Sequence, residues 1–153
     1  MFAHWKVVLC LVFVQASPGY SNELFDFIEC GGDPVQSVTI DDCSAVPCTF
    51  QFGRTYHVQI KPEYINPEVD NAPISLGILQ YGAYFEQNVT VNNPCVFGCP
   101  ITTRLEYPEF DLHFNVSSRL VQLPSIMRIE SSYLNGGTSS VGFCIEMDTT
   151  ITN

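Results

Sequence analysis

Positive charge is scarce in this sequence. Its 153 residues include six Lys and Arg against 16 Asp and Glu, which gives a formal net charge of −10 at pH 7. Proteins that bind nucleic acids need a basic surface to meet the phosphates, so this composition argues against a nucleic-acid partner. An anionic membrane surface is disfavoured for the same reason. The basic residues beyond the N-terminal segment are Arg54, Lys61, Arg104, Arg119 and Arg128.

A hydrophobic run long enough to cross a membrane is also missing. The longest apolar stretch, residues 7–14, is too short to span a bilayer. Because it follows a basic start and precedes small residues, it is typical of a secretory signal peptide cleaved between Ala16 and Ser21. We therefore expect residues 1–20 to be removed. Residues 21–153 are expected to form one soluble domain, secreted or lysosomal, without stable membrane insertion.

Tryptophan is absent beyond Trp5, which lies in the expected signal peptide. An ordinary immunoglobulin-type sandwich is filled at its centre by a tryptophan that packs on a disulfide between the sheets. A sandwich formed by this chain would lack that central pin.

Catalytic and metal-binding motifs are missing as well. No serine lies in a nucleophile-elbow pattern, which argues against nucleophilic catalysis. His57 and His113 fall at polar positions of two alternating segments, where solvated surface histidines are common. Asp41 and Asp42 are adjacent, so on a strand they would point to opposite faces rather than share a site. We expect no enzyme, no metal and no cofactor other than a bound cargo.

What the sequence does contain is a repeated alternation of apolar and polar residues. Within residues 55–64, Tyr56, Val58 and Ile60 alternate with polar residues, and residues 110–117 alternate in the same way. A period of two places one side of a strand on a core and the other in water. The pattern predicts an all-β, immunoglobulin-like two-sheet β sandwich of about seven strands, without a helix. The strands are expected at residues 25–31, 35–40, 55–64, 74–79, 110–117, 126–134 and 141–151.

Six cysteines remain once Cys10 is lost with the signal peptide. An even number in a secreted chain indicates a disulfide framework, although six cysteines allow 15 pairings. Short spacing favours two local links, the first of which would pin the end of a hairpin ahead of Gly53. A zinc site at Cys95 and Cys99 is the alternative, and secretion makes it less favourable. The favoured pairs are Cys43–Cys48, Cys95–Cys99 and Cys30–Cys144.

The two expected sheets would face each other with a large apolar surface. A gap between such faces would be a dry slot for an apolar ligand. The pattern alone favours the alternative, in which the same side chains interdigitate in a close-packed core. The residues expected to face inward are Ile40, Tyr56, Val58, Ile60, Ile78, Phe110, Phe114, Ile126 and Phe143.

Two sequons for N-glycosylation are present, at Asn88 and Asn115. Asn115 lies at a polar position of its strand, where a sugar would be tolerated in a secreted protein.

The order of the cysteines and their neighbours resembles the ML domain, a lipid-recognition family. Within it the chain is most similar to the Niemann-Pick type C sterol-transfer proteins and the group 2 mite allergens. The resemblance covers nearly the whole of residues 21–153. The segments that carry it are Cys30-Gly31, Cys43 to Pro47-Cys48, Gly53 to Tyr56 and Val58, Gly77-Ile78-Leu79, Cys95 to Cys99-Pro100-Ile101, Leu123-Pro124-Ser125-Ile126 and Phe143-Cys144-Ile145-Glu146.

The resemblance implies that two sheets part to admit a lipid, and it implies the same three disulfides. It favours an internal apolar cavity over a filled core, with Tyr84 or Phe85 near the mouth. The chain departs from the family where residues 80–85 replace a proline-rich mouth, and where Arg119 falls near an apolar pocket position. Together with the inward-facing residues, the candidate lipid-binding set is Ile40, Tyr56, Val58, Ile60, Ile78, Tyr84, Phe85, Phe114, Leu123, Pro124, Ile126 and Phe143.

Three functions are compatible with this pattern. The leading hypothesis is a secreted, monomeric carrier of a single lipid, whether a sterol, a fatty acid or a phospholipid, which a membrane sterol acceptor or a receptor would take over. A second is an innate-immunity accessory or allergen-like module that recognises a glycolipid or phospholipid. A third is a lipid-free domain with a filled core. The scarcity of Lys and Arg makes a neutral ligand the preferred one.

Overall fold

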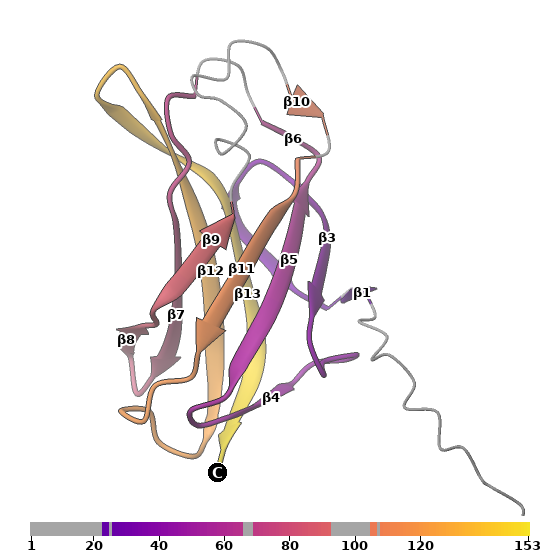
Figure 1. Cartoon of the computed structure of the whole chain (residues 1–153), viewed down its shortest axis with the longest axis vertical. Helices are drawn as coiled ribbons and strands as arrows, with labels where there is room; N and C mark the ends of the chain where they lie inside the picture. Colours follow the sequence, from indigo (N-terminus) through magenta and orange to yellow (C-terminus); the bar gives the residue numbers. More distant parts are fainter. Residues whose placement is uncertain (1–22, 25, 66–68, 93–104, 107) are drawn as a thin grey trace, which may run out of the picture.

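The computed structural model describes residues 23–24, 26–65, 69–92, 105–106 and 108–153, and these ranges contain strands but no helix (Figure 1). The strands in chain order are β1 (Glu23–Leu24), β2 (Ile28–Gly32), β3 (Val35–Ile40), β4 (Cys48–Gln51), β5 (Thr55–Pro62), β6 (Tyr64–Ile65), β7 (Ile74–Gln80), β8 (Ala83–Glu86), β9 (Val89–Asn92), β10 (Leu105–Glu106), β11 (Phe110–Asn115), β12 (Pro124–Asn135) and β13 (Thr138–Thr152).

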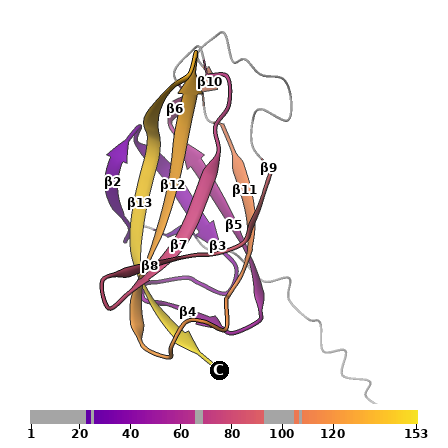
Figure 2. The ribbon, with the colours of Figure 1, turned by 90° about the vertical axis from the view of Figure 1, so that its left-hand side faces the viewer.

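Two sheets pack face to face. One has the order β1-β3-β5-β11-β9, and the other has the order β2-β13-β12-β7-β8, with β4 added in parallel beside β13. The layers lie one in front of the other in Figure 1 and side by side in Figure 2, where β8 faces the viewer. The short pair β6–β10 lies at one end of the sandwich. The predicted all-β, immunoglobulin-like two-sheet sandwich is therefore confirmed.

The alternation in residues 55–64 forms strand β5 as predicted. Tyr56, Val58 and Ile60 are at most 1% exposed, and each pairs with an apolar residue of β11 in antiparallel register. The strand stops at Pro62, because proline has no N–H to continue the ladder. Tyr64 starts the separate strand β6.

A tight hairpin at residues 135–137 joins β12 to β13. Asn135 pairs with Thr138 across a turn in which Gly136 and Gly137 have φ of 53° and 86°. Positive φ at both central residues is the two-residue turn that matches the twist of a hairpin. Strands β12 and β13 are longer than predicted, because their pairing continues across a bulge to the turn.

The Cys43–Cys48 link does not pin a hairpin, which corrects the sequence prediction. Strand β3 belongs to one sheet, whereas β4 pairs in parallel with Thr149–Thr152 of β13 in the other. The disulfide therefore lies where the chain crosses between the sheets. Strand β4, which was not predicted, runs across the same end of the sandwich as the C-terminus (Figure 1).

The long disulfide, Cys30–Cys144, is present as predicted and joins β2 to β13 within one sheet. Cys43–Cys48 links the two sheets at the rim. Cys95 and Cys99 lie outside the described residues. Neither described disulfide crosses the middle of the sandwich, so at mid-height the sheets are held by side-chain packing.

The interior is closed around its central side chains. Ile40, Val58, Ile60 and Phe143 have no accessible area, so no water-sized space lies against them. Phe50 packs edge-on against Tyr56 at a centroid distance of 4.8 Å. At these positions the expected open slot is not seen, because the two faces interdigitate.

Candidate functional site

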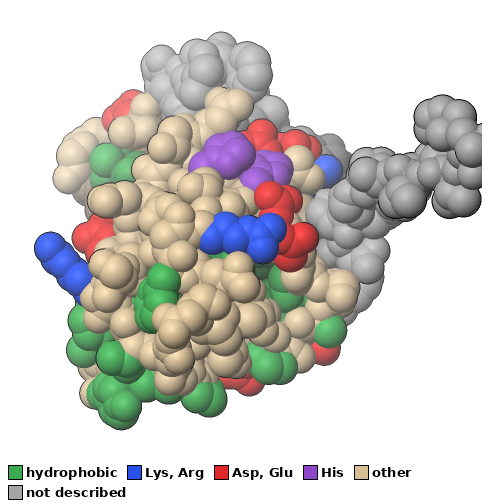
Figure 3. Space-filling view, turned by 60° about the horizontal axis from the view of Figure 1, so that its bottom comes forward, with side chains coloured by type: hydrophobic (Ala, Val, Ile, Leu, Met, Phe, Trp, Pro, Cys, Tyr) green, Lys and Arg blue, Asp and Glu red, His purple; other side chains and the backbone are tan. Residues whose placement is uncertain are grey.

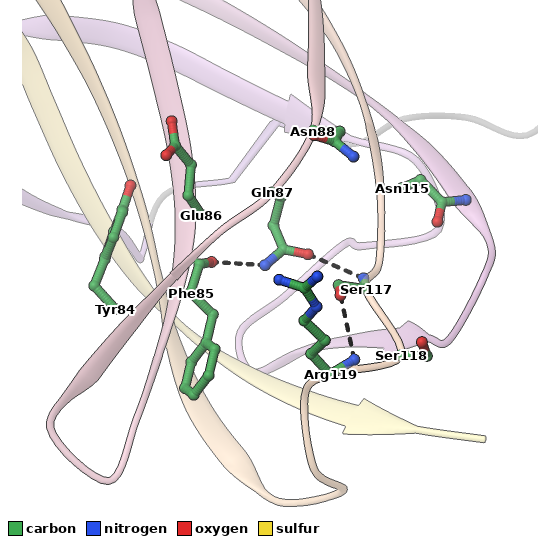
Figure 4. A pocket seen from close by; sticks show the side chains of 9 residues that line it. All are labelled: Tyr84, Phe85, Glu86, Gln87, Asn88, Asn115, Ser117, Ser118 and Arg119. Carbon is green, nitrogen blue, oxygen red and sulfur yellow. Dashed lines mark hydrogen bonds between the residues drawn. The ribbon is translucent and has the colours of Figure 1, made fainter.

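A cleft among the described residues opens at one edge of the sandwich. There the chain passes from β8, on the edge of one sheet, to β9, on the edge of the other. Its volume of about 680 Å³ is within the usual size range of small-molecule pockets. The lining residues are Tyr84, Phe85, Glu86, Gln87, Asn88, Asn115, Ser117, Ser118 and Arg119 (Figure 4).

Phe85 connects the cleft with the core. It pairs with Ile78 of β7, and it is partly buried against the hydrophobic core. Ile78 itself is 1% exposed. Residues directly opposite in an antiparallel pair share a face, so Phe85 and Ile78 both point between the sheets. Displacing the Phe85 ring would open the cleft towards Ile78.

Tyr84 forms the outer rim of the same cleft. Leu76 and Ile78 face inward, so Gly77 between them faces outward. A Cβ at Gly77 would lie 2.1 Å from the Tyr84 ring, which shows that the phenol covers this glycine on the outer face. Burial against the sheet raises the pKa of Tyr84, and a hydrogen bond with Ser75 opposes that rise. Of the two aromatics expected near the mouth, Phe85 is the one that reaches inward.

Two buried glutamines hold the 117–123 segment, which joins β11 to β12, against the β7–β8 edge. Gln87 Nε2 donates to the Phe85 carbonyl at 2.6 Å, and Gln87 Oε1 accepts from Ser117 N at 3.0 Å (Figure 4). Gln80 Nε2 donates to the Val121 carbonyl at 2.9 Å, and Gln80 Oε1 accepts from Val121 N at 3.0 Å. Both glutamines are 3% exposed. The segment is thus fastened at two points.

A search of solved structures found a match over most of this chain. It is the crystal structure of a Niemann-Pick type C2 protein from the Japanese carpenter ant, with a TM-score of 0.61 and 18% sequence identity. The match covers 84% of this chain and 100% of the ant protein. The chain has the Niemann-Pick type C2 fold. The predicted resemblance to the ML domain is thereby confirmed at the level of the fold.

Sequence comparison finds less than structural comparison does. No family model matches the chain, and no curated protein sequence matches it either.

Most of the candidate pocket residues lie where the Niemann-Pick type C2 fold brings its two sheets together. The interior contains Ile40, Tyr56, Val58, Ile60, Ile78, Phe114 and Phe143, all at most 1% exposed. They form the core beyond Phe85, whereas the cleft itself is lined mostly by polar residues.

Ile126 does not face inward, which corrects the sequence prediction. It is 39% exposed, whereas its neighbours Ser125 and Met127 are buried. Pro124 is exposed as well and Leu123 is partly exposed. Pro124 and Ile126 line a groove of about 400 Å³ on the outer face of the sheet, beside Tyr81. The hydrophobicity of Ile126 suggested burial, but the phase of β12 is set by its pairing with β7 and β13.

The two histidines lie on the outer face of the other sheet, outside the cleft. His57 and His113 stack with centroids 4.8 Å apart, and His57 Nε2 lies 3.1 Å from Asp111 Oδ1. Figure 3 shows the pair beside acidic side chains. In the described part of the chain, no three His, Cys, Asp or Glu residues are grouped so that they could hold a metal ion.

The asparagines of the two sequons lie at the cleft. Asn88 and Asn115 both line it, and Asn115 Nδ2 donates to the Gly53 carbonyl at 2.8 Å. Glycosylation of either asparagine stays a prediction.

No helix within the described ranges has the length and apolarity needed to span a membrane.

The glutamine contacts can be tested one at a time. In Gln87→Leu, we expect the Ser117 amide to lose its hydrogen-exchange protection while the Val121 amide, held by Gln80, keeps it. The free energy of unfolding should fall by about 1–3 kcal/mol, because buried hydrogen bonds are lost. Gln59→Leu is the control, since Gln59 bonds to Glu109 on the surface and should change stability by less than about 0.5 kcal/mol. Equal loss of protection at both amides would show that the two glutamines do not act separately.

Proposed function

We propose that this protein is a secreted or lysosomal carrier that binds one lipid molecule between its two sheets. The observation that carries the proposal is the cleft of about 680 Å³ whose inner wall, Phe85, packs directly on the buried core. The fold supports it, because the solved structure that it matches is a Niemann-Pick type C2 protein. The strongly acidic composition is also compatible, because a protein in transit between membranes must detach from anionic surfaces.

Loading requires the closed interior to open. The Phe85 ring and the 117–123 segment would move outward, which breaks the Gln87–Ser117 contact and exposes Ile78 and its neighbours to the lipid. The tail of the lipid then replaces side-chain contacts that are lost when the sheets part. The disulfide Cys30–Cys144 lies in one sheet and Cys43–Cys48 lies at the rim, so neither prevents opening at the β8–β9 edge.

No covalent bond changes in this mechanism. A ligand efficiency of about 0.3 kcal/mol per heavy atom gives a sterol-sized lipid of roughly 28 heavy atoms an affinity of about 8 kcal/mol, or a Kd near 1 μM. Such an affinity is tight enough for transport and weak enough for release to an acceptor protein or membrane.

Native mass spectrometry tests the proposal. Protein secreted by eukaryotic cells should carry about one equivalent of lipid, which organic extraction releases and identifies. The delipidated protein should rebind one equivalent of an added sterol, fatty acid or phospholipid. Protein that is lipid-free as secreted, and that binds none of these three lipid classes, would exclude a carrier and favour a domain with a filled core.

A further inference from the structure

Arg119 differs from the other basic residues that the structure describes. Each of the other three is paired with a carboxylate, whereas Arg119 forms no ion pair with any described acidic residue. The pairs are Arg54–Asp42, Lys61–Glu109 at 3.0 Å, and Arg128–Glu130 at 2.8 Å. In a chain with 16 acidic and six basic residues, an arginine without a carboxylate partner is a free anion-binding group.

The charge of Arg119 lies at the cleft. Its guanidinium points into the cleft towards Gln87 (Figure 4). The one acidic lining residue, Glu86, comes from β8 and directs its carboxylate away from Arg119 (Figure 4). The backbone N–H of Arg119 donates to Ser117 Oγ at 3.2 Å, which orders the turn that presents the side chain.

The rest of the cleft wall is rich in neutral donors. The hydroxyls of Ser117 and Ser118 and the amide of Asn88 line it around Arg119. A guanidinium offers two parallel N–H groups that match the two oxygens of a carboxylate, and charge-assisted hydrogen bonds of this kind are roughly twice as strong as neutral ones. The site is therefore better suited to an anionic head than to the single neutral hydroxyl of a sterol.

The cleft also gives the ligand a direction. Phe85 lies in the same wall as Arg119 and contacts the core behind it. A molecule with its head at Arg119 would have its apolar part beside Phe85, facing Ile78. The site thus fits an amphiphile with one charged end and one long hydrocarbon chain.

We propose that Arg119 binds the carboxylate of a long-chain fatty acid whose hydrocarbon tail enters the sandwich beside Phe85, an inference that rests on the proposed carrier function. A fatty acid is an anionic ligand, whereas the scarcity of Lys and Arg in the sequence had favoured a neutral one. One arginine is enough, because the cleft needs to hold a single negative charge.

The experiment compares two probes with the same tail and different heads, palmitate and 1-hexadecanol. Affinities are measured by displacement of a fluorescent lipid from the wild-type chain, Arg119→Gln and the matched control Arg54→Gln. We expect Arg119→Gln to weaken palmitate by about tenfold or more and to change 1-hexadecanol by less than about twofold. Arg54→Gln should leave both affinities unchanged, because Arg54 lies outside the cleft. Raising the salt concentration should weaken palmitate in the wild type and much less in Arg119→Gln.

Four outcomes would overturn the inference, and the last of them would also exclude the carrier function. If palmitate binds Arg119→Gln as tightly as the wild type, Arg119 is a solvated surface residue. If both probes weaken equally, Arg119 acts through packing and not through charge. Cholesterol, measured in parallel, separates the two proposals: a wild-type chain that binds cholesterol and 1-hexadecanol but not palmitate is a carrier of neutral lipids, whereas one that binds none of the three is not a carrier.

Discussion

Replacing Cys30 and Cys144 together by alanine is expected to lower the free energy of unfolding by about 4–5 kcal/mol. The two residues are 114 positions apart, and in the chain-entropy model the stabilisation grows with the length of the loop that a disulfide closes. Single domains have unfolding free energies of about 5–15 kcal/mol, so the loss is a large part of the total. The variant should be secreted poorly and should unfold at a much lower urea concentration.

The matched comparison is Cys43→Ala with Cys48→Ala. These residues are only five positions apart, and the same model gives about 2 kcal/mol. Urea unfolding of both double variants, with the slope of free energy against urea recorded, separates a change in stability from a change in the denatured state. Equal losses would mean that native packing around the sulfurs, and not loop length, determines the effect.

The positions of the longer strands and of the β12–β13 turn follow from local sequence patterns, so the sequence predicts them well. In β5 and β11 every second residue is apolar, and each such residue is buried. Gly136 and Gly137 supply the positive φ that the β12–β13 turn requires. Such features depend on residues a few positions apart, so they can be recognised without knowledge of the partner strand.

The features that the sequence misses depend on distant partners. Strand β4 is only four residues long and exists because it pairs with Thr149–Thr152, about a hundred positions later. The inward face of β12 includes Ser125 and Ser131, which are 8% and 0% exposed, so polarity alone assigns the wrong face to Ile126. Burial here is decided by register with β7 and β13.

The cleft could be predicted only in part. Phe85 and Arg119 are both noticeable in the sequence, one as a possible mouth residue and the other as a charge near an apolar position. Their meeting with Gln87 requires the chain to cross from β8 to β9 at the sandwich edge, and neither of those strands was predicted. Strands β8 and β9 have four residues each, so a period of two repeats only twice in them and is hard to recognise.

A closed core and a carrier function are compatible if the packing that closes the sandwich is weaker at the cleft than elsewhere. Near the cleft the interior is bounded by one partly buried ring, Phe85, and by hydrogen bonds from Gln87 and Gln80. In the strand order, β4 lies beside β13, on the side away from β8, and there its disulfide bridges the two sheets. The sandwich is therefore expected to open as a hinge, with the β8–β9 edge moving and the edge beside β4 remaining closed.

Ile78→Trp is expected to weaken lipid binding by about 100-fold or more while the chain remains folded. Ile78 faces Phe85 between the sheets, so an indole at this position would occupy the space into which the lipid tail must enter. The larger ring overpacks the core, which should lower the free energy of unfolding by about 1–3 kcal/mol. Displacement of a fluorescent lipid gives the affinity, and urea unfolding gives the stability.

The control is the next residue along β7. Leu79 points to the opposite side of the sheet, where it lines the outer groove with Pro124 and Ile126. Leu79→Trp should therefore change lipid affinity by less than about twofold, although it adds an indole of the same size. If the two tryptophans weaken binding equally, or if Ile78→Trp binds lipid as the wild type does, the cargo does not lie between the sheets. A lipid bound between the sheets would be displaced by the tryptophan at position 78, whereas a lipid bound on the outer face would be displaced by the one at position 79. The difference in lipid affinity between the two variants therefore shows where the lipid binds.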